Sequence, residues 1–391
     1  MIQQDTLNEI HTAARKLLNK ELKPRVAETE HSGEFCFPAF RALGNAGLAA
    51  PMFPDPWGLG SISAQVAVAE EMGYYSSGFG LSALASVCLF GSNVARQGTE
   101  EQRRKYLPGI ASGDKIGCWA LTEPSIGSDA VSIQTRCDRK EDHYVLTGSK
   151  TFITNAPIAD SFIVLAREVG PDGKLVSGFQ SGTAFILDRG MDGLRTGKPL
   201  HKMGHRSSPT GEIFLDQVKV PMNQVLGKPG MAFLGMKASL DVERAVFGGL
   251  GVGLMRFCLD TMVRYGAARK QFGVPILEHQ MVQEKIAEVA AWTEMLVAYR
   301  DHVNHKLETG QSVNKEAAVL KFMGARWAFQ AADHAIQTLG GYGYMEEYEV
   351  ERCLRDAKLY DIGGGTTEIQ RMIIAKQVIK EILNASNHAA S

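Results

Sequence analysis

The segment Trp119-Ala-Leu-Thr-Glu-Pro-Ser-Ile-Gly-Ser-Asp129 stands where the texture of the chain changes. Before it, in residues 5–115, apolar side chains recur every three or four positions, which is typical of amphipathic helices. After it, short apolar runs such as residues 161–166 and 183–187 alternate with turns rich in glycine and aspartate, which favours strands. The segment itself is typical of a strand that enters a turn rich in hydroxyls and exposed amides. Such a turn can hydrogen-bond a polar heterocycle or a phosphate, but taken alone an ordinary turn is the simpler interpretation.

Helical patterns return after Pro229-Gly230. Apolar positions step by three or four through residues 282–307, and the pattern resumes after Gly310. Two long amphipathic helices joined by a short turn predict an antiparallel bundle. We therefore expect a mainly α protein with a middle β domain. Its parts would be an N-terminal helical domain over residues 1–117, a β domain over 118–226 and a C-terminal helical bundle over 227–391, with a polar tail after Leu383.

Composition argues against several classes of function. The formal net charge is −1 and no long basic run is present, which argues against a nucleic-acid-binding surface. The six cysteines lie far apart without CxxC spacing, so we expect reduced thiols and no metal site. Residues 1–5 are polar and acidic, unlike a targeting peptide, and the most apolar stretch, residues 79–89, is shorter than the roughly 20 residues of a membrane span. The sequence predicts a soluble cytoplasmic protein.

Further motifs follow the opening segment. They are Lys150-Thr-Phe-Ile-Thr-Asn155, Arg269-Lys-Gln-Phe-Gly273, His279-Gln280, Gln337-Thr-Leu-Gly-Gly-Tyr-Gly343, Arg355-Asp-Ala-Lys-Leu-Tyr360 and Gly365-Thr366. Together, in this order and at these separations, they resemble the acyl-CoA dehydrogenase family over essentially the whole chain. The resemblance implies an N-terminal helical domain, a middle β-barrel-like domain, a C-terminal four-helix domain, non-covalently bound FAD, and homotetramers built as pairs of dimers.

The resemblance assigns two groups of residues to the cofactor. The first group would line the flavin and the neighbouring thioester end: Trp119, Leu121, Thr122, Ser128, Phe152 and Thr154, where Phe152 replaces a tryptophan common in the family. The second group would hold the pyrophosphate and adenosine part, with the Gln-Gly-Gly segment coming from a neighbouring subunit: Arg269, Phe272, Gln337, Gly340 and Gly341. A guanidinium forks onto phosphate, and glycines let backbone amides approach it. Gln280, Thr366 and Glu368 complete the set, while a helix C-cap at Gly340-Gly341 and a solvated Arg269 remain open alternatives.

The catalytic base departs from the usual family pattern. Most members carry a glutamate directly before a Gly-Thr, but here the run is Tyr360-Asp-Ile-Gly-Gly-Gly-Thr366, so Gly364 occupies that position. Either the protein is defective or the base comes from elsewhere. Leu240-Asp-Val-Glu-Arg244 matches the helix on which the isovaleryl-CoA and long-chain branches carry their base, with Glu243 at the matching site. Asp361 is the fallback base, and a solvated helix charge is the alternative for Glu243.

Other residues are expected at the thioester. The amide of Gly364 would donate to its carbonyl, and the missing side chain would leave room for a branched or cyclic acyl group. Asp241 is expected to bind the substrate. Arg244 would face the phosphate-bearing arm of the thioester or pair with a structural carboxylate, and Ser128 would lie near the thioester end. A buried carboxylate beside an apolar acyl chain would have a raised pKa, which suits the base.

The substrate remains open between two thioesters. The segment Asn155-Ala-Pro-Ile-Ala-Asp160 resembles L-prolyl carrier-protein dehydrogenases, whereas residues 355–366 are closer to the isovaleryl branch. We expect an FAD enzyme that oxidises a short or branched acyl-CoA to its 2-enoyl form and passes electrons to an electron-transfer flavoprotein. A dehydrogenase of acyl groups on a carrier protein, an oxidase of the same fold that uses oxygen, and a structural helical bundle are the alternatives.

Overall fold

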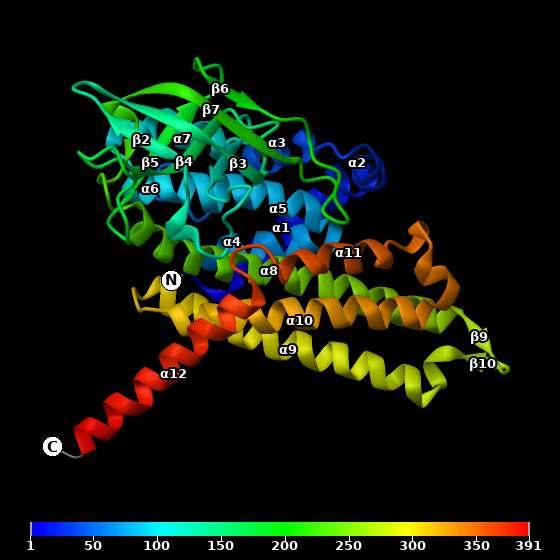
Figure 1. Ribbon diagram of the computed structural model, residues 1–391. Coiled ribbons are helices and arrows are strands. Elements are labelled where there is room, and N and C mark those ends of the chain that lie inside the picture. The colour runs from blue at the N-terminus through cyan, green and yellow to red at the C-terminus, as the bar shows by residue number, and fades with distance from the viewer. Residues whose placement is uncertain (1, 390–391) are drawn as a thin grey trace.

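The computed structural model describes the backbone of residues 2–389 and the side chains of residues 2–385. Its N-terminal part is helical, as predicted (Figure 1). Thr99 caps the start of one helix, because its hydroxyl accepts from the N–H of Gln102 at 3.2 Å and its own N–H donates to the Gln102 side chain at 3.0 Å. The helices are α1 (Gln4–Glu21), η1 (Lys23–Arg25), α2 (Val26–Ser32), α3 (Phe37–Asn45), α4 (Ile62–Tyr75), α5 (Ser77–Leu84), the π-helical η2 (Ala85–Gly91), α6 (Ser92–Gln97) and α7 (Glu100–Ala111).

A mixed β-sheet forms the middle of the chain. Its order is β6-β7-β3-β2-β4-β5-β8, and β1 pairs in parallel with β4. All the strand-like runs singled out in the sequence lie in these strands, since alternating and fully apolar runs fit a sheet covered by helices. The strands are β1 (Gly117–Ala120), β2 (Arg136–Arg139), β3 (His143–Thr154), β4 (Ser161–Glu168), β5 (Gly182–Asp188), β6 (Leu194–Thr196), β7 (Thr210–Pro221) and β8 (Val225–Leu226), with 3₁₀ turns η3 (Ala130–Ser132) and η4 (Met222–Gln224).

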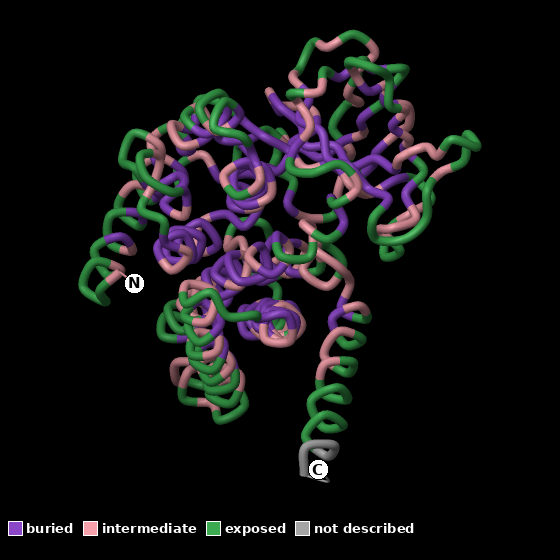
Figure 2. The backbone as a smooth tube through the Cα atoms, turned by 90° about the vertical axis from the view of Figure 1, so that its left-hand side faces the viewer, coloured by how far each residue is buried: buried purple, intermediate pink, exposed green. Residues whose placement is uncertain are grey.

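Long helices return at residue 232. α9 and α10 run antiparallel through a turn at Gly310, as predicted (Figure 1). The last helix extends away from the body of the molecule in both views and continues to Ala389, so the expectation of a tail after Leu383 is wrong (Figures 1 and 2). The elements are α8 (Ala232–Ala268), β9 (Lys270–Gln271), β10 (Val274–Pro275), η5 (Ile276–Glu278), α9 (Gln280–Glu308), α10 (Asn314–Leu339), η6 (Gly340–Tyr344), η7 (Glu346–Tyr348), α11 (Val350–Tyr360) and α12 (Thr367–Ala389).

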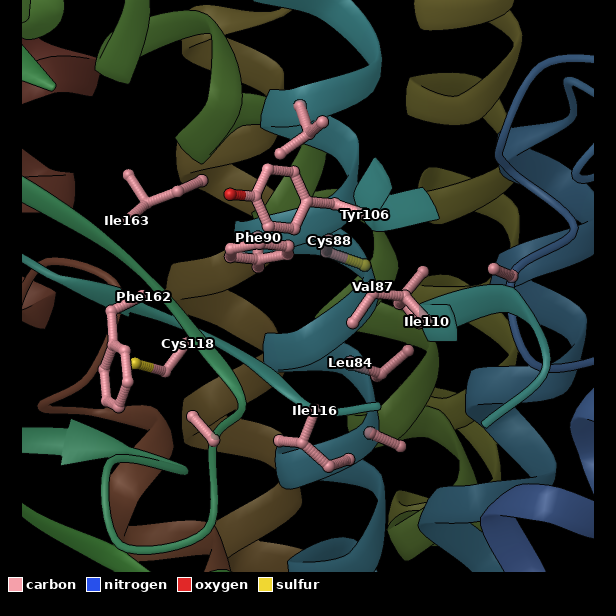
Figure 3. Packing of buried hydrophobic residues seen from close by; sticks show 14 of the residues in the cluster. Leu84, Val87, Cys88, Phe90, Tyr106, Ile110, Ile116, Cys118, Phe162 and Ile163 are labelled. Carbon is pink, nitrogen blue, oxygen red and sulfur yellow. The ribbon is translucent and has the colours of Figure 1, made fainter. Parts of the chain in front are cut away.

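The core joins helices to the sheet through η2. Figure 3 shows Cys88 and Phe90 of η2 among side chains from α5, α7, β1 and β4. The ring of Phe90 meets that of Tyr106 edge to face at 5.8 Å, and the hydroxyl of Ser86 accepts from the N–H of Gly117 at 2.9 Å. The π-helical segment therefore fixes β1, the strand that leads into residues 119–129, against the helical part.

Close helix packing fixes α8 against α4. A Cβ added at Gly253 would overlap the backbone carbonyl oxygen of Glu70, and one at Gly73 would overlap that of Leu250. The two glycines therefore let the backbones of α4 and α8 approach more closely than any larger residue allows. Because α8 contributes to both apolar clusters of the molecule, this contact sets the position of every side chain along it.

Two helical stretches have the length and hydropathy of a membrane span, Ser77–Gln97 and Ala232–Ala268. In the first, α5, η2 and α6 form one run of 21 residues, so the expectation that the apolar stretch is confined to residues 79–89 is wrong. The two apolar windows are 83% and 61% buried inside the protein, as core helices are, so their length is weak evidence for a membrane span.

Candidate active site

Glu243 lies on the first third of α8 and is buried, with only 8% of its surface exposed. Its Oε2 atom has no hydrogen-bond partner among the described residues. Burial raises the pKa of Glu243 to about 7, although the cations of Arg244 and Lys321 oppose this effect. A carboxyl group in this state is a strong enough base at neutral pH and has a free oxygen to accept a proton. The interpretation of Glu243 as a solvated helix charge is therefore wrong.

A glycine turn faces Glu243. Gly364 and Gly365 have φ of 63° and 87°, which glycine adopts without strain. A Cβ added at Gly364 would lie 3.5 Å from Oε1 of Glu243, so the structure brings the predicted base to the position that Gly364 leaves open. Thr366 begins α12, where its hydroxyl accepts from the N–H of Ile369 at 3.3 Å. The exposed Glu368 lies in the same turn of α12.

Asp361 is already engaged by its neighbours. Its carboxylate accepts from Lys358 at 3.0 Å and from the hydroxyl of Thr367 at 2.9 Å. Although burial raises its pKa, these two hydrogen bonds hold the pKa of Asp361 below its ordinary value. A carboxyl with its charge satisfied in this way is a weak base, which argues against the fallback assignment.

Arg244 and Asp241 form a buried pair. Nη1 of Arg244 donates to Asp241 at 3.0 Å, and Asn314 on α10 donates to the same oxygen at 3.4 Å. Burial raises the pKa of Asp241 and Arg244 opposes the rise. The structure thus places Arg244 on a structural carboxylate, which is the second of its two predicted roles. Nε of Arg244 is buried without a partner among the described residues, so one donor stays free for a ligand.

The predicted flavin-edge residues lie on β1, on the segment that follows it and on β3. The N–H of Thr151 donates to the carbonyl oxygen of Thr122 at 3.0 Å, which joins the two motifs. Phe152 sits at an irregularity in the β3–β7 ladder with φ of 56° and is 68% exposed. Around it, Trp119, Leu121, Thr122 and Thr154 are half-buried, and Ser128 is exposed. An exposed aromatic face bordered by backbone and hydroxyl groups suits a flat heterocycle with polar edges.

A buried ion pair beneath this surface was missed by sequence reasoning. Lys150 is fully buried, and its Nζ donates to Glu123 at 2.8 Å and to the carbonyl oxygen of Leu121 at 3.0 Å. Burial lowers the pKa of Lys150 to about 8, although Glu123 opposes this. The pair ties the 119–129 segment to β3. The only available signal was that the 150–155 motif contains a lysine and the 119–129 motif contains two acidic residues, Glu123 and Asp129.

The remaining predicted cofactor residues lie at the other end of α8. Tyr265 near the end of α8 meets Tyr342 of η6 at 6.2 Å, which places Arg269 and the Gly340-Gly341 segment in one region. Gly340, with φ of 60°, caps α10, and a Cβ added at either glycine would meet no atom within 4 Å. The other members of this group are exposed in the same region: Arg269, Phe272 at 95% exposure, Gln280 and Gln337.

The distal group does not meet Glu243 within one chain. Arg269 follows Glu243 by 26 residues along one helix. At 1.5 Å per residue this is about 39 Å along the axis. By contrast, η2 connects the flavin-edge residues to Glu243, since it packs on β1 and the Glu243 charge further raises the pKa of its buried Cys88 thiol.

The Asn155–Asp160 segment is a structural connection. The side-chain amide of Asn155 donates to the carbonyl oxygens of Ser82 at 2.9 Å and Gly117 at 3.2 Å. Asp160 accepts from Lys115 at 2.9 Å and from the N–H of Ile116 at 2.9 Å. Both polar ends of the segment are therefore bound within the protein, between β3, α5 and β1.

The protein consists of a helical part, a β-sheet and a second helical part, with a buried carboxyl group at Glu243 and an exposed aromatic side chain at Phe152. Residues 4–114, 118–218 and 233–379 match the N-terminal, middle and C-terminal domains of acyl-CoA dehydrogenases. The chain belongs to the acyl-CoA dehydrogenase family and is an FAD-dependent oxidoreductase that acts on acyl thioesters. The exact boundaries expected at residues 117 and 226 stay a prediction.

Individual relatives cover the chain almost completely. Mitochondrial isovaleryl-CoA dehydrogenase of Solanum tuberosum is 36% identical over 382 residues, which cover 96% of this chain and 91% of that protein. The structure of butyryl-CoA dehydrogenase from Megasphaera elsdenii is similar with a TM-score of 0.91 and 32% identity, covering 97% of this chain and 99% of that one. The prolyl acyl carrier protein oxidase AnaB gives a TM-score of 0.91 at 29% identity, covering 96% of this chain and all of that one (100%).

Proposed function

We propose that this protein oxidises a short or branched acyl-CoA to the 2-enoyl-CoA, with Glu243 as the catalytic base. The observation that carries the proposal is the state of Glu243: a buried carboxyl with one free oxygen, a pKa near 7 and a side-chain-free turn directly opposite. The usual position of the base holds Gly364, which has no side chain to ionise. Asp361 is paired, so Glu243 is the carboxylate with capacity to take a proton.

The chemistry divides between cofactor and protein. FAD, when bound, accepts the hydride that leaves the β carbon. Glu243 accepts the proton from the α carbon, so that two bonds to hydrogen break and one carbon–carbon double bond forms. The N–H of Gly364 would donate to the thioester carbonyl and stabilise the negative charge that develops there. The Phe152 face, with Trp119, Leu121, Thr122 and Thr154, would hold the flat ring, and Ser128 would border the thioester.

Two features favour a short or branched CoA ester. Relatives named as isovaleryl-CoA dehydrogenases align over nearly the whole chain, and the turn at Gly364 leaves space beside the base. The carrier-protein alternative rests on likeness to AnaB and on residues 155–160. Because the side chains of Asn155 and Asp160 already form hydrogen bonds within the protein, that segment gives little support to the docking of a carrier protein. We therefore place the CoA ester first.

The location of the two cofactor groups supports an oligomer. One chain supplies the flavin edge near Glu243 and the phosphate-binding candidates about 39 Å away along α8. A second copy would bring its own distal group to the first copy's flavin edge. The exposed apolar side chains of Met372, Ile379 and Leu383 on the projecting α12 favour contact with further copies. We propose a homotetramer, an electron-transfer flavoprotein as acceptor and a cytoplasmic location, the last supported by six unpaired cysteines.

Anaerobic bleaching of the flavin absorbance by a panel of thioesters tests the function. Isovaleryl-, butyryl- and long-chain acyl-CoA would be compared with prolyl and acyl groups on a carrier protein. Rapid bleaching by short or branched CoA esters is expected, and preference for carrier-bound groups would overturn the substrate assignment. Reoxidation of the bleached enzyme by air within one turnover time would favour the oxidase.

Glu243→Gln tests the base directly. The variant is expected to retain FAD and bind thioester, because the amide is isosteric, yet to lose bleaching by several orders of magnitude, since the amide cannot accept the proton. Asp361→Asn is the matched control and is expected to bleach far faster than Glu243→Gln. Near-parental bleaching by Glu243→Gln would remove Glu243 from the mechanism.

A further inference from the structure

Lys321 of α10 contacts the glycine turn that faces Glu243. Its Nζ donates to the carbonyl oxygen of Gly365 at 2.7 Å, and its side chain is half-buried. None of the sequence motifs includes this lysine. Its ammonium acts on the charge of Glu243, and it is the only cation besides Arg244 whose influence on that carboxyl is resolved among the described residues.

The glycine turn is held from two helices. Nε2 of Gln370 on α12 donates to the same Gly365 oxygen at 2.9 Å, so both lone pairs of this carbonyl are used. Gly363, Gly364 and Gly365 form a run with large conformational freedom, and ordering such a run has a high entropic cost. Two donors on one carbonyl select one shape of the turn, and this shape places Gly364 opposite Glu243. Without Lys321, only the fully buried Gln370 would hold the carbonyl.

Charged and titratable groups near Glu243 come from several elements. Arg244 adjoins it on α8 and pairs with Asp241, whereas the Cys88 thiol lies on η2. Lys321 comes from α10, and Asp361 and Glu368 act on Lys321 from the turn and from α12. Arg244 is the stronger cation acting on Glu243, although it also pairs with Asp241, and Lys321 adds a second positive charge from a different helix. Burial lowers the pKa of Lys321 to about 8, so it is still mostly charged at neutral pH.

We propose that Lys321 is a positioning residue of the reaction, which holds the Gly364–Gly365 turn opposite Glu243 and adds, to that of Arg244, a positive charge on the side of the turn. The proposal rests on the proposed role of Glu243 as base. It gives one side chain two effects that can be measured separately, the ionisation of Glu243 and the order of the turn.

Three substitutions separate the two effects. Lys321→Met removes the charge and the donor, Lys321→Gln removes the charge but can donate to the turn, and Lys321→Arg keeps both. Lys315→Met is the matched control, because Lys315 lies on the same helix and pairs with Glu381 on the surface. The holoenzyme of each variant is titrated without substrate by infrared difference spectroscopy, with the Glu243 carboxyl band identified by its absence in Glu243→Gln.

The expected result is a rise of about one pH unit in the midpoint of Glu243 in Lys321→Met and Lys321→Gln, because a nearby cation favours the carboxylate. Lys321→Arg and Lys315→Met should keep the parental midpoint. At a pH high enough to ionise Glu243 fully, bleaching should still be roughly tenfold slower in Lys321→Met, because the turn is less ordered, and partly restored in Lys321→Gln. If Lys321→Met does not fold, Lys321→Gln alone tests the midpoint.

An unchanged midpoint in the charge-removing variants, or parental bleaching by Lys321→Met at high pH, overturns the proposal. The base assignment is tested in a different experiment, and it fails there if Glu243→Gln bleaches at the parental rate. In that case the infrared midpoint would still report whether Lys321 acts on the Glu243 carboxyl. The two failures are therefore distinguishable.

Discussion

At the scale of single residues, the burial of Glu243 reduces stability at neutral pH. A carboxyl group moved from water into a site with one unpartnered oxygen prefers the neutral form. Burial raises its pKa from the ordinary value of 4.5 to about 7. The protein tolerates this cost at the carboxyl that we propose takes a proton from a weak carbon acid, whereas Asp361 nearby has a pKa held below its usual value.

The rate of flavin bleaching should depend on pH through this group. Only the ionised form of Glu243 accepts a proton, so the rate constant is expected to rise with pH through a midpoint near 7 and then level off. Stopped-flow bleaching at saturating thioester across pH 5 to 9 measures this directly, within the range over which the protein stays folded. A midpoint near 4.5 would mean that the carboxyl is solvated in the working enzyme.

Glu243→Gln should also stabilise the fold at alkaline pH. The folded pKa is raised, so the stability that Glu243 contributes is complete below pH 4.5 and is lost as pH rises through 7. A glutamine does not have to ionise. The free energy of unfolding of the variant should therefore be higher than that of the parent by up to roughly 3 kcal/mol at pH 8, at 1.4 kcal/mol per pKa unit, and by little at pH 5. Urea unfolding at the two pH values checks this, with Glu294→Gln on the exposed face of α9 as control. Equal gaps at both pH values would contradict it.

The sequence pointed to a single residue where a family motif lacked its usual side chain. The glycine at position 364 removed the ordinary base, and this pointed to Glu243. The Lys150–Glu123 pair was not predictable, because nothing in either motif says that their side chains meet inside the protein. Lys321 was hidden for the same reason, as its partner is a backbone carbonyl on a different element.

At the scale of elements, the contact between α4 and α8 holds the base in place. Gly253 and Gly73 allow the helices to touch through their backbones, and Glu243 lies 10 residues before Gly253 on α8. A displaced α8 would move the carboxylate relative to the glycine turn, and a shift of about 1 Å lowers rates substantially.

Gly253→Ala is therefore expected to destabilise the protein by about 1 to 3 kcal/mol, since its methyl group would overlap the carbonyl oxygen of Glu70. Gly251→Ala is the matched control on the same helix, where an added Cβ meets only Tyr360 at 4.0 Å. This variant should be neutral or more stable by up to about 1 kcal/mol, because alanine favours helix. Chemical denaturation distinguishes them, and equal effects of the two substitutions would show that α4 and α8 do not pack this closely.

The types of the elements followed from periodicity, but their irregularities did not. Spacings of two and of three to four residues predicted the strands and the long helices, because burial of one face imposes these periods. The φ of 56° at Phe152 has no signal in the sequence, since an aromatic residue does not favour that conformation. The continuation of α12 to Ala389 also escaped prediction, because the polar residues there suggested a tail.

At the scale of the whole molecule, the predicted flavin-edge residues and the predicted phosphate-binding residues lie at opposite ends of α8. The flavin-edge residues lie beside η2, and Arg269 with Gly340 lies at the far end of α8, about 39 Å along the axis from Glu243. The family resemblance predicted the members of each group. The resemblance did not predict how far apart the two groups lie in space, because that distance depends on the length of α8, which only the structure shows.

Mixed oligomers can decide whether the site is shared between chains. Glu243→Gln should be inactive because it lacks the base, and Arg269→Ala should be inactive because it loses a phosphate contact and retains FAD poorly. If Glu243 of one chain works with Arg269 of its neighbour, a dimer of the two variants contains one site with both defects and one site with none.

Random pairing makes half of the dimers mixed, so co-expression should restore about one quarter of the parental bleaching, whereas either variant alone gives almost none. Placing both substitutions in one chain and co-expressing it with the parent is the control. Its mixed dimers have one defect at each site, so only the parental dimers, about one quarter of the total, bleach, whereas sites held within single chains would give about one half. Absence of recovery in the first mixture, although native mass spectrometry detects the mixed dimer, would mean that each chain holds its cofactor alone, and the 39 Å separation would then require a different position for FAD.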